Sequence, residues 1–371
     1  MNLIETARLQ PADPLQLLVW MERFNEAVNW LSGVAFREHL WHWLPLQRRG
    51  YREVRARFQL PSAAAVVAVR KVAYAYRNKQ RRRCLARFRR RGAVPVYHHR
   101  YKRDDTVVLY GFRIPFTARP QARLSSSHQA VLCYRRGKFI LHQAIEVDVP
   151  ALATIHDYLG CDLGTTNLLT DSTQEAYSGQ AVEEKRRIYT HRRQRLQKRG
   201  TRAARRKLRQ ISGRQGRYQR DTSHGIAKRV VAKAQRLCYG IALEDLRGIR
   251  GRIKARRRQR PRLHNWSFGQ LRQFIVYKAA RAGVPVVFVD PANTSRTCPA
   301  CGHVDKRNRR SQSEFQCRRC GHAGPADVIA ARNIRAWARG DAPMVASVRA
   351  ATSPFPASIG DNRLIIWAPT Q

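Results

Sequence analysis

The sequence predicts an α/β domain in the C-terminal part of the chain, preceded by a helical part and a small antiparallel β-element. From about residue 155 onward, short apolar segments alternate with long stretches that contain few helix breakers, which is the pattern of an α/β sheet. Between residues 104 and 150, apolar and polar residues alternate with a period of two, as in half-buried strands. Within residues 14–103, apolar residues recur at spacings of three and four, as on one face of a helix.

The N-terminal elements follow from these patterns in order. A short extended stretch ends at Pro11, and helical periodicity then runs from Leu17 to Ala35 and again from Ser62 to Tyr76. Predicted strands of the β-element are Thr106–Tyr110, Ala130–Tyr134, Lys138–His142 and Ile145–Val149, with a hairpin turn at Arg135–Gly137.

The C-terminal part contains the buried type of strand, which is apolar on both faces. Predicted strands are Tyr158–Asp162, Asn167–Thr170, Leu237–Leu243 and Val284–Val289. Most of residues 185–236 should be helical, and an amphipathic helix should run from Trp266 to Tyr277. The tail from Asp341 contains no motif, and we expect it to be loosely ordered.

The charge of the chain predicts a polyanionic partner. The 371 residues include 72 Lys and Arg against 25 Asp and Glu, which gives a formal net charge of +47 and a pI of about 11.5. The basic residues gather in 77–103, 185–236 and 250–262. A solvated helix face is the alternative for the first of these runs, but aromatic residues interleaved with its charges favour nucleic acid.

Composition also excludes several classes of protein. Apolar residues make up 43% of the chain, which argues against disorder. The longest apolar run, Ala63–Val69, is far too short to span a membrane. The N-terminus lacks the pattern of a secretory signal. We therefore expect a soluble protein of the cytoplasm that holds nucleic acid.

Three acidic residues lie where predicted elements begin or end. Asp162 and Glu244 follow apolar strands, and Asp327 lies in the first turn of a predicted helix. Carboxylates at such positions can converge and hold two Mg²⁺ ions, which promote in-line phosphodiester displacement. A turn-forming residue is the alternative for Asp162 and a helix cap is the alternative for Asp327, whereas Glu244 directly follows seven mostly apolar residues and is poorly placed for a surface ion pair. Asp245 is a rival for the role of Glu244, and Asp171 and Asp290 are weaker candidates in the same region.

Four of the eight cysteines have the spacing of a zinc site. Cys298 and Cys301 form one C-x₂-C pair, Cys317 and Cys320 form a second, and each pair is followed by a glycine. Four thiolates in this pattern predict a closed, structural Zn²⁺ site, with disulfides as the alternative. His303 and His322 flank the pairs and are not needed as ligands.

Several strings resemble the motifs of a known family. They are Gly-Cys-Asp-Leu-Gly-Thr-Thr-Asn-Leu around Asp162, Ala-Leu-Glu-Asp-Leu-Arg-Gly around Glu244, Ala-Asp-Val-Ile-Ala-Ala-Arg-Asn-Ile around Asp327, and Thr-Ser-Arg-Thr-Cys ending at Cys298. They are similar to the RuvC-like motifs and the Thr-Ser-x-x-Cys signature of the TnpB (OrfB) family of transposon-encoded RNA-guided nucleases. The stretch Phe268–Asn293 resembles the family's linking helix and strand.

The resemblance implies an RNase H-like (RuvC) α/β nuclease domain with an inserted zinc ribbon. It also implies that Asp162, Glu244 and Asp327 are catalytic and hold Mg²⁺, and that an N-terminal helical recognition part lies within a β-barrel wedge. One residue departs from the family pattern, because Ile329 stands where the family usually has Asn two residues after the third acid. This departure concerns the residues that hold the metal-binding acids in place, and therefore the cleavage activity.

The domain boundaries follow from the motifs and the resemblance. We expect an N-terminal part over 1–150, with its recognition helices at about 14–103. The nuclease domain should occupy 151–293 and resume at 323–340 around the zinc ribbon of 294–322, leaving 341–371 as a tail.

The resemblance implies an RNA-guided, Mg²⁺-dependent DNA endonuclease associated with an insertion sequence. Its partners would be a guide RNA from the transposon end and a target DNA, held through their backbones in a positive channel, and we expect a monomer. A second candidate is a miniature type V CRISPR effector with the same chemistry and another RNA source. A third is a nucleic-acid-binding relative with weak or no cleavage, and a fourth is a guide-independent junction nuclease.

Overall fold

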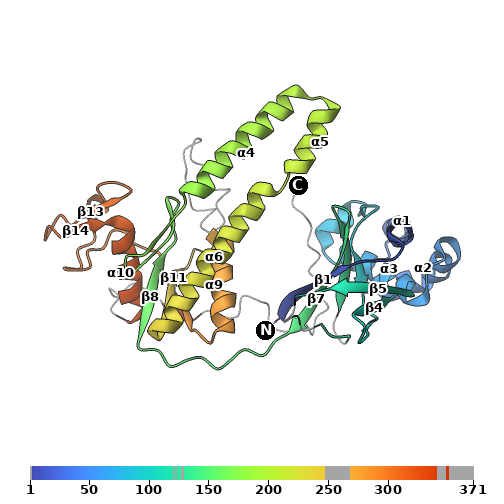
Figure 1. Cartoon of the computed structure of the whole chain (residues 1–371), viewed down its shortest axis with the longest axis horizontal. Coiled ribbons are helices and arrows are strands. Elements are labelled where there is room, and N and C mark those ends of the chain that lie inside the picture. Colours follow the sequence, from blue (N-terminus) through green and yellow to red (C-terminus); the bar gives the residue numbers. More distant parts are fainter. Residues whose placement is uncertain are drawn as a thin grey trace. The chain divides into compact units, whose positions relative to one another are not determined.

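The computed structural model describes residues 2–119, 122, 124–126, 129–246, 268–340 and 348–350. The predicted basic run 250–262, the start of the predicted helix at Trp266 and most of the predicted tail lie outside the described residues. The chain divides into two compact units, Met1–Asp148 and Val149–Gln371, and each unit is considered by itself (Figure 1).

The first unit consists of a seven-stranded antiparallel sheet and three α-helices that lie between its first and second strands. The helices are α1 (Pro14–Arg37), α2 (Trp43–Phe58) and α3 (Ser62–Ala75), followed by the 3₁₀ turn η1 (Lys79–Arg83). The strands are β1 (Asn2–Leu9), β2 (Val94–Val96), β3 (His99–Tyr101), β4 (Thr106–Leu109), β5 (Phe112–Thr117), β6 (Ala130–Arg135) and β7 (Lys138–Glu146). Their order in the sheet is β2-β6-β7-β1-β5-β4-β3.

The structure confirms both predicted helices of this unit and adds one. Helix α1 begins where Asp13 accepts hydrogen bonds from the backbone N–H groups of Leu15 and Gln16, both 2.9 Å long, a standard N-cap. Helix α2 has no counterpart in the prediction. Its buried residues are Leu46, Gly50 and Val54, so its apolar face is narrow and the basic residues between them obscure the periodicity.

One predicted strand of this unit was wrong, and so was the alternative considered for its basic run. Ile145–Val149 is not a separate strand, because Ile145 belongs to β7, which pairs with β1 without interruption from Asn2↔Glu146 to Leu9↔Phe139. The basic segment after α3 is not a helix face: its last part forms β2 and β3. These short strands depend on pairing with β6 and β4, which local sequence does not show.

The second unit is built on a six-stranded mixed sheet of order β10-β9-β8-β11-β12-β15. Its strands are β8 (Asp157–Asp162), β9 (Asn167–Asp171), β10 (Ala176–Ser178), β11 (Tyr239–Glu244), β12 (Val286–Val289) and β15 (Val348–Ala350). Its helices are α4 (Gln180–Arg199), α5 (Arg202–Ile211), α6 (Arg214–Leu237), α9 (Phe268–Arg281) and α10 (Ala326–Ala338). Strands β8, β11 and β12 are parallel neighbours, while the other pairs are antiparallel.

Helices cover both faces of this sheet. Ile241 and Leu243 of β11 pack with residues of α6 and α9, whereas Ala242, between them, packs with Ile334 and Trp337 of α10. Side chains alternate between the two faces of a strand, so the even-numbered residues of β11 face α10. Figure 1 shows α6 and α9 on one side of β8 and β11, with α10 on the other.

Gly160 of β8 allows α10 to approach the sheet closely. A Cβ atom at this position would lie 2.1 Å from the carbonyl oxygen of Ala331 and 2.6 Å from the backbone nitrogen of Arg335. Only glycine permits this contact between strand and helix backbones. Gly160 therefore sets how near α10 lies to β8.

The predicted strand Leu237–Leu243 begins two residues later than expected. Leu237 is the last residue of α6, and Cys238 ends that helix with a positive φ of 53°. The apolar character of Leu237 and Cys238 made them indistinguishable from strand residues. None of the described helices is long and apolar enough to cross a membrane.

Candidate functional site

The structure places Asp162 and Glu244 at the same end of neighbouring strands. Asp162 is the last residue of β8 and Glu244 the last of β11. These strands are parallel, with Leu243 opposite Cys161, so their carboxyl ends meet at one edge of the sheet. Asp162 lies two residues after Gly160 on β8, and Glu244 lies two residues after Ala242 on β11. Residues two apart on a strand face the same side of the sheet, so both acids lie on the face that α10 covers.

Helix α10 adds the third acid. Asp327 is its second residue, and α10 packs along β8 with Gly160 at the contact. The N-terminal end of a helix favours negative charge, which suits a carboxylate at this position. Three acids that are far apart in the sequence thus lie on one face at one edge of the sheet.

The electrostatics of the three carboxylates show that they interact. Burial, together with the nearby charges of Glu244 and Asp327, raises the pKa of Asp162 well above its ordinary value. Burial also raises the pKa of Glu244 to about 7, against the opposing effects of a hydrogen bond from Thr294 and the charge of Arg309. Like charges in a partly buried site resist simultaneous ionisation, so a divalent cation bound to carboxylate oxygens would stabilise the charged cluster.

Three side chains that the sequence did not single out contact these acids. Asn167 donates a 3.1 Å hydrogen bond from Nδ2 to Oδ2 of Asp327. Arg309 lies 3.5 Å from Oδ1 of Asp327, and its charge lowers the pKa of Asp162 and of Glu244. Thr294 donates from Oγ1 to Oε1 of the buried Glu244. Thr294 and Asn167 were quoted only as parts of motifs, and nothing in the sequence marked Arg309.

Asn333 connects this network to α10. Its Nδ2 donates to the carbonyl oxygens of Thr294 at 2.7 Å and Thr297 at 2.8 Å, and all three residues are buried. Thr294 in turn bonds Glu244, and Thr297 directly precedes Cys298. One amide therefore joins the helix that carries Asp327 to the segment that orients Glu244 and starts the cysteine cluster.

Ile329, where the family pattern has Asn, does not face the acids. It is 1% exposed and packs in a small apolar cluster with Cys298, Phe315, Cys317 and Ala326. The amide that bonds Asp327 comes from Asn167 of β9. Although position 329 carries no side-chain amide, Asp327 still has an amide donor, because Asn167 of β9 supplies it.

The rival acids have other partners. Asp171 is fully buried and accepts hydrogen bonds from Thr173 and Lys233. Asp245 lies 3.5 Å from Arg272, and Asp290 caps a turn through the N–H of Ala292 at 2.8 Å. Asp171 and Asp245 are thus ion-paired, and the charge of Asp290 raises the pKa of Glu244 from nearby.

The four clustered cysteines converge on one point. Their Sγ atoms lie within 4.8 Å of one another, with 3.6 Å between Cys298 and Cys320 and between Cys301 and Cys317. A tetrahedral zinc site with Zn–S bonds of about 2.3 Å requires sulfur separations of about 3.8 Å. All eight cysteines lie among the described residues and are free thiols. The cluster fits Zn²⁺ and contains no disulfide.

The backbone around each cysteine pair folds back on itself. The N–H of Gly302 donates to the carbonyl of Cys298 at 3.0 Å, and that of Gly321 to the carbonyl of Cys317 at 3.1 Å. Both glycines have positive φ values, 69° and 76°, a conformation that residues with a β-carbon rarely adopt. Two paired strands flank the second pair, β13 (Glu314–Gln316) before it and β14 (Ala323–Pro325) after it, and β14 leads directly into α10.

The chain is similar in sequence to one family model and to several known proteins. Residues 268–334 match the family model described as Cas12f1-like, TNB domain. The chain is 42% identical over 114 residues to the CRISPR-associated endodeoxyribonuclease Cas12f1 of Sulfoacidibacillus thermotolerans, covering 30% of this chain and 26% of that protein. It is 34% identical over 128 residues to the TnpB-like protein MJ0751 of Methanocaldococcus jannaschii, covering 34% and 45%.

A third relative is the putative RNA-guided DNA endonuclease InsQ of Escherichia coli, 45% identical over 67 residues, which cover 18% of this chain and 17% of InsQ. Over these stretches, this chain is similar to Cas12f1 and TnpB-like proteins. The predicted resemblance to the TnpB family is thereby confirmed. Each of these matches covers less than half of the relative's length.

Proposed function

We propose that this TnpB relative is an RNA-guided, Mg²⁺-dependent DNA endonuclease associated with an insertion sequence. The observation that carries the proposal is the gathering of Asp162, Glu244 and Asp327 on one face at one edge of the mixed sheet. A mixed sheet with helices on both faces supports an RNase H-like nuclease fold. Three of its relatives are named as endonucleases or as TnpB-like.

The three acids would hold two Mg²⁺ ions through their carboxylate oxygens. Bound there, the ions would activate the attacking water and stabilise the charge that develops on the phosphodiester. The side chains around the acids hold them in place: Thr294 bonds Glu244 and Asn167 bonds Asp327. Arg309 adds a fixed positive charge beside the carboxylates, suited to the phosphate of a bound strand.

The cysteine cluster would be a structural zinc ribbon over residues 294–322. Four protein ligands leave no position for water or substrate, so the ion would act on the fold. The apolar cluster shared by Cys298, Cys317, Phe315 and Ala326 packs directly against the first turn of α10. Zinc would therefore fix the position from which Asp327 reaches the other acids.

The remaining proposals concern partners and domains. Residues 1–150 would form the recognition part, whose helices between β1 and β2 would read a short flanking motif of the target DNA, and 151–293 with 323–340 would form the nuclease domain. A guide RNA from the transposon end would pair with the target DNA, and the basic segments would hold the backbones. This division accounts for a net charge of +47 around a small acidic site.

The test is plasmid cleavage by the full chain, co-expressed with the DNA that flanks its gene so that its natural RNA is present. Cleavage should require Mg²⁺, a matching target and the RNA. Asp162→Asn should abolish cleavage while DNA and RNA binding stay nearly unchanged. Asp245→Asn is the matched control, because Asp245 is an adjacent acid that pairs with Arg272. Full cleavage by Asp162→Asn would refute the assignment of the acids.

The same assay separates the four candidate functions. Co-purified RNA that maps to a CRISPR array would identify a miniature type V effector. Cleavage that survives RNase treatment would identify a guide-independent nuclease. Guide-dependent DNA binding without cleavage would identify a catalytically weak relative.

A further inference from the structure

Helices α4 and α5 form a strongly basic hairpin, which we call the basic arm (residues 180–211). The two helices are joined at Gly200 and Thr201 and contact each other. Their sequences contain thirteen Lys and Arg residues and only two acids, Glu183 and Glu184. This is a denser positive charge than in the sheet that carries the acidic site.

The arm contributes almost nothing to the core of its unit. Helix α4 has no buried residue over its 20 positions, and α5 buries only Ala204 and Ile211. The buried residues of α6, which follows, begin at Ser223, so its first half lies outside the core as well. Figure 1 shows α4 and α5 continuing beyond the end of the sheet that α6 covers. Packing therefore does not explain why this segment is retained in the fold.

Most of the charges on the arm have no acidic partner in the described part of the chain. Arg186 pairs with Glu183, and Arg193 bonds Gln215 at 3.0 Å. No ion pair within the described ranges involves the exposed residues Arg187, Arg195, Lys198, Arg199, Arg202, Arg205, Arg206, Lys207 and Arg209. Like charges at this density repel one another, and a polyanion would relieve that repulsion.

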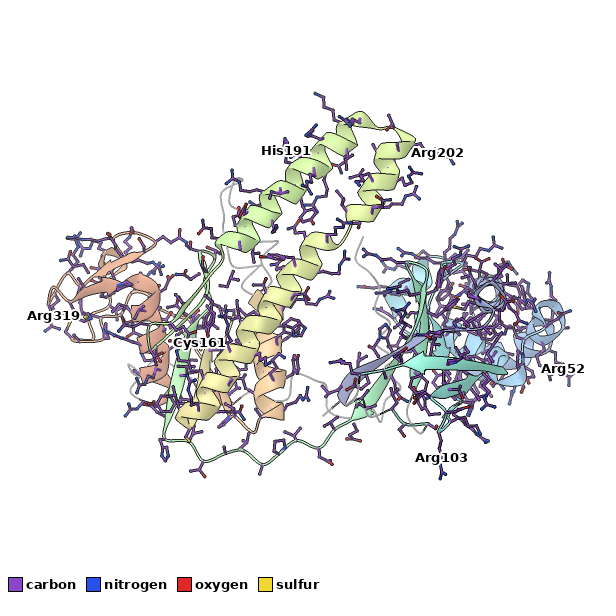
Figure 2. All side chains as sticks on the ribbon, viewed as in Figure 1. Arg52, Arg103, Cys161, His191, Arg202 and Arg319 are labelled. Atoms are coloured by element: carbon purple, nitrogen blue, oxygen red, sulfur yellow. The ribbon has the colours of Figure 1, made fainter. Side chains whose placement is uncertain are left out.

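The directions in which the basic side chains of the arm point indicate which kind of polyanion it would bind. An α-helix turns about 100° per residue, so Arg187 and Lys198 point the same way, whereas Arg192 and Arg199 point about 120–140° away from Arg187. Figure 2 shows side chains leaving the arm in several directions, with His191 and Arg202 labelled on α4 and α5. A straight duplex lies on one side of a helix. A folded RNA can place backbone strands on more than one side, and it satisfies this pattern better.

We propose that the basic arm binds the structured part of the guide RNA through its phosphates, apart from the acidic site and from the pairing of guide and target. This inference rests on the proposed function, since that function requires a guide RNA. Arg187, Arg195 and Lys198 are the residues of α4 to test first. They lie on an exposed helix surface, and their replacement creates no cavity.

The test measures RNA binding alone, without cleavage. The probe is the most abundant RNA that co-purifies with the wild-type chain, transcribed again in vitro. Its affinity is measured over a range of salt concentrations for wild type and for Arg187→Gln/Arg195→Gln/Lys198→Gln. Each phosphate contact contributes about 0.7 to 0.9 to the slope of log affinity against log salt, so the variant's slope should be shallower by about 2 to 3.

Helix α2 offers a matched control. Arg48, Arg52 and Arg55 are exposed on that helix and have no ion pair among the described residues. Arg48→Gln/Arg52→Gln/Arg55→Gln removes the same charge and should change the RNA slope by less than one contact. Helical content of both variants is checked by circular dichroism, and affinity for target duplex without RNA is measured in parallel.

Three results would overturn the inference. They are an unchanged slope in the arm variant, an equal loss in the two variants, and a loss confined to DNA. Each leaves the proposed function standing, because wild type would still bind RNA and cleave. Absence of any co-purifying RNA from the wild-type chain would instead refute the proposed function.

Discussion

Adding a single methyl group at Gly160 should leave the sheet folded but change the geometry of the acidic site. In Gly160→Ala, the new Cβ would lie 2.1 Å from the carbonyl oxygen of Ala331, and real Cβ atoms essentially never come within 3.0 Å of such an atom. Strand β8 and helix α10 must therefore separate by about 0.9 Å. The two shortest contacts at this position, to the carbonyl oxygen of Ala331 and the nitrogen of Arg335, involve backbone atoms that have no alternative rotamer.

The cost follows from this displacement. Overpacking of a well-packed contact costs about 1–3 kcal/mol, and the rigidity of both backbones places Gly160→Ala at the upper end. Helix α10 carries Asp327, while β8 carries Asp162, so the two carboxylates move apart with their elements. A misplacement of about 1 Å can reduce a rate by about 100-fold, and we expect a loss of that order in single-turnover cleavage.

The assay compares Gly160→Ala with Gly240→Ala on the neighbouring strand. A Cβ at Gly240 would meet the ring of Tyr158 at 2.8 Å and the terminal methyl of Ile155 at 2.9 Å, and these side chains can move. Urea unfolding should therefore show a smaller loss for Gly240→Ala, and cleavage by that variant should be nearly normal. If Gly160→Ala unfolds within about 0.5 kcal/mol of wild type and cleaves at the wild-type rate, Gly160 does not set the position of α10.

Three further predictions concern buried groups and the cysteine cluster. Asn333→Ala removes the donor to two buried carbonyls, which should lower the free energy of unfolding by about 2–5 kcal/mol and speed zinc release to a chelator. The control is Asn25→Ala, which removes an equally buried amide that bonds two carbonyls in the other unit and should leave the rate of zinc release unchanged. Equal rates of zinc release in the two variants would contradict the role of Asn333. Chelation of zinc, or Cys317→Ser, should lower the melting temperature of the second unit and reduce cleavage, and unchanged melting after verified zinc removal would exclude a structural role. Burial lowers the pKa of Lys71 to about 7, so the unfolded chain binds more protons than the folded one from about pH 7 to 10. The free energy of unfolding of the first unit should therefore rise with pH in this window, by at most about 1.4 kcal/mol per pH unit. Urea unfolding at about pH 7 to 9 measures this dependence, and Lys71→Met should make it flat. A flat dependence in the wild-type chain would contradict the burial of the amine.

Local patterns in the sequence predicted the cysteine cluster and most of the strands. Two C-x₂-C pairs, each followed by a glycine, contain their own geometry, because the knuckle forms within five residues. Apolar runs such as Leu159–Cys161 predict a buried strand wherever it pairs. Helix α2 and strands β2 and β3 escaped prediction because their apolar residues are few, and the partner of β2, strand β6, is also distant in the chain.

The sequence alone therefore determined which residue types could do chemistry: three carboxylates at the ends of elements, four thiols at knuckle spacing, and an excess of positive charge. Only the tertiary structure decided which neighbours those groups have. Asn167 reaches Asp327 across 160 positions of sequence, Thr294 reaches Glu244 across 50, and Asn333 reaches Thr294 across 39. Such contacts form because the parallel pairing of β8 with β11 and the seating of α10 on Gly160 bring distant segments to one edge of the sheet, and no local pattern records which distant segment will pack there.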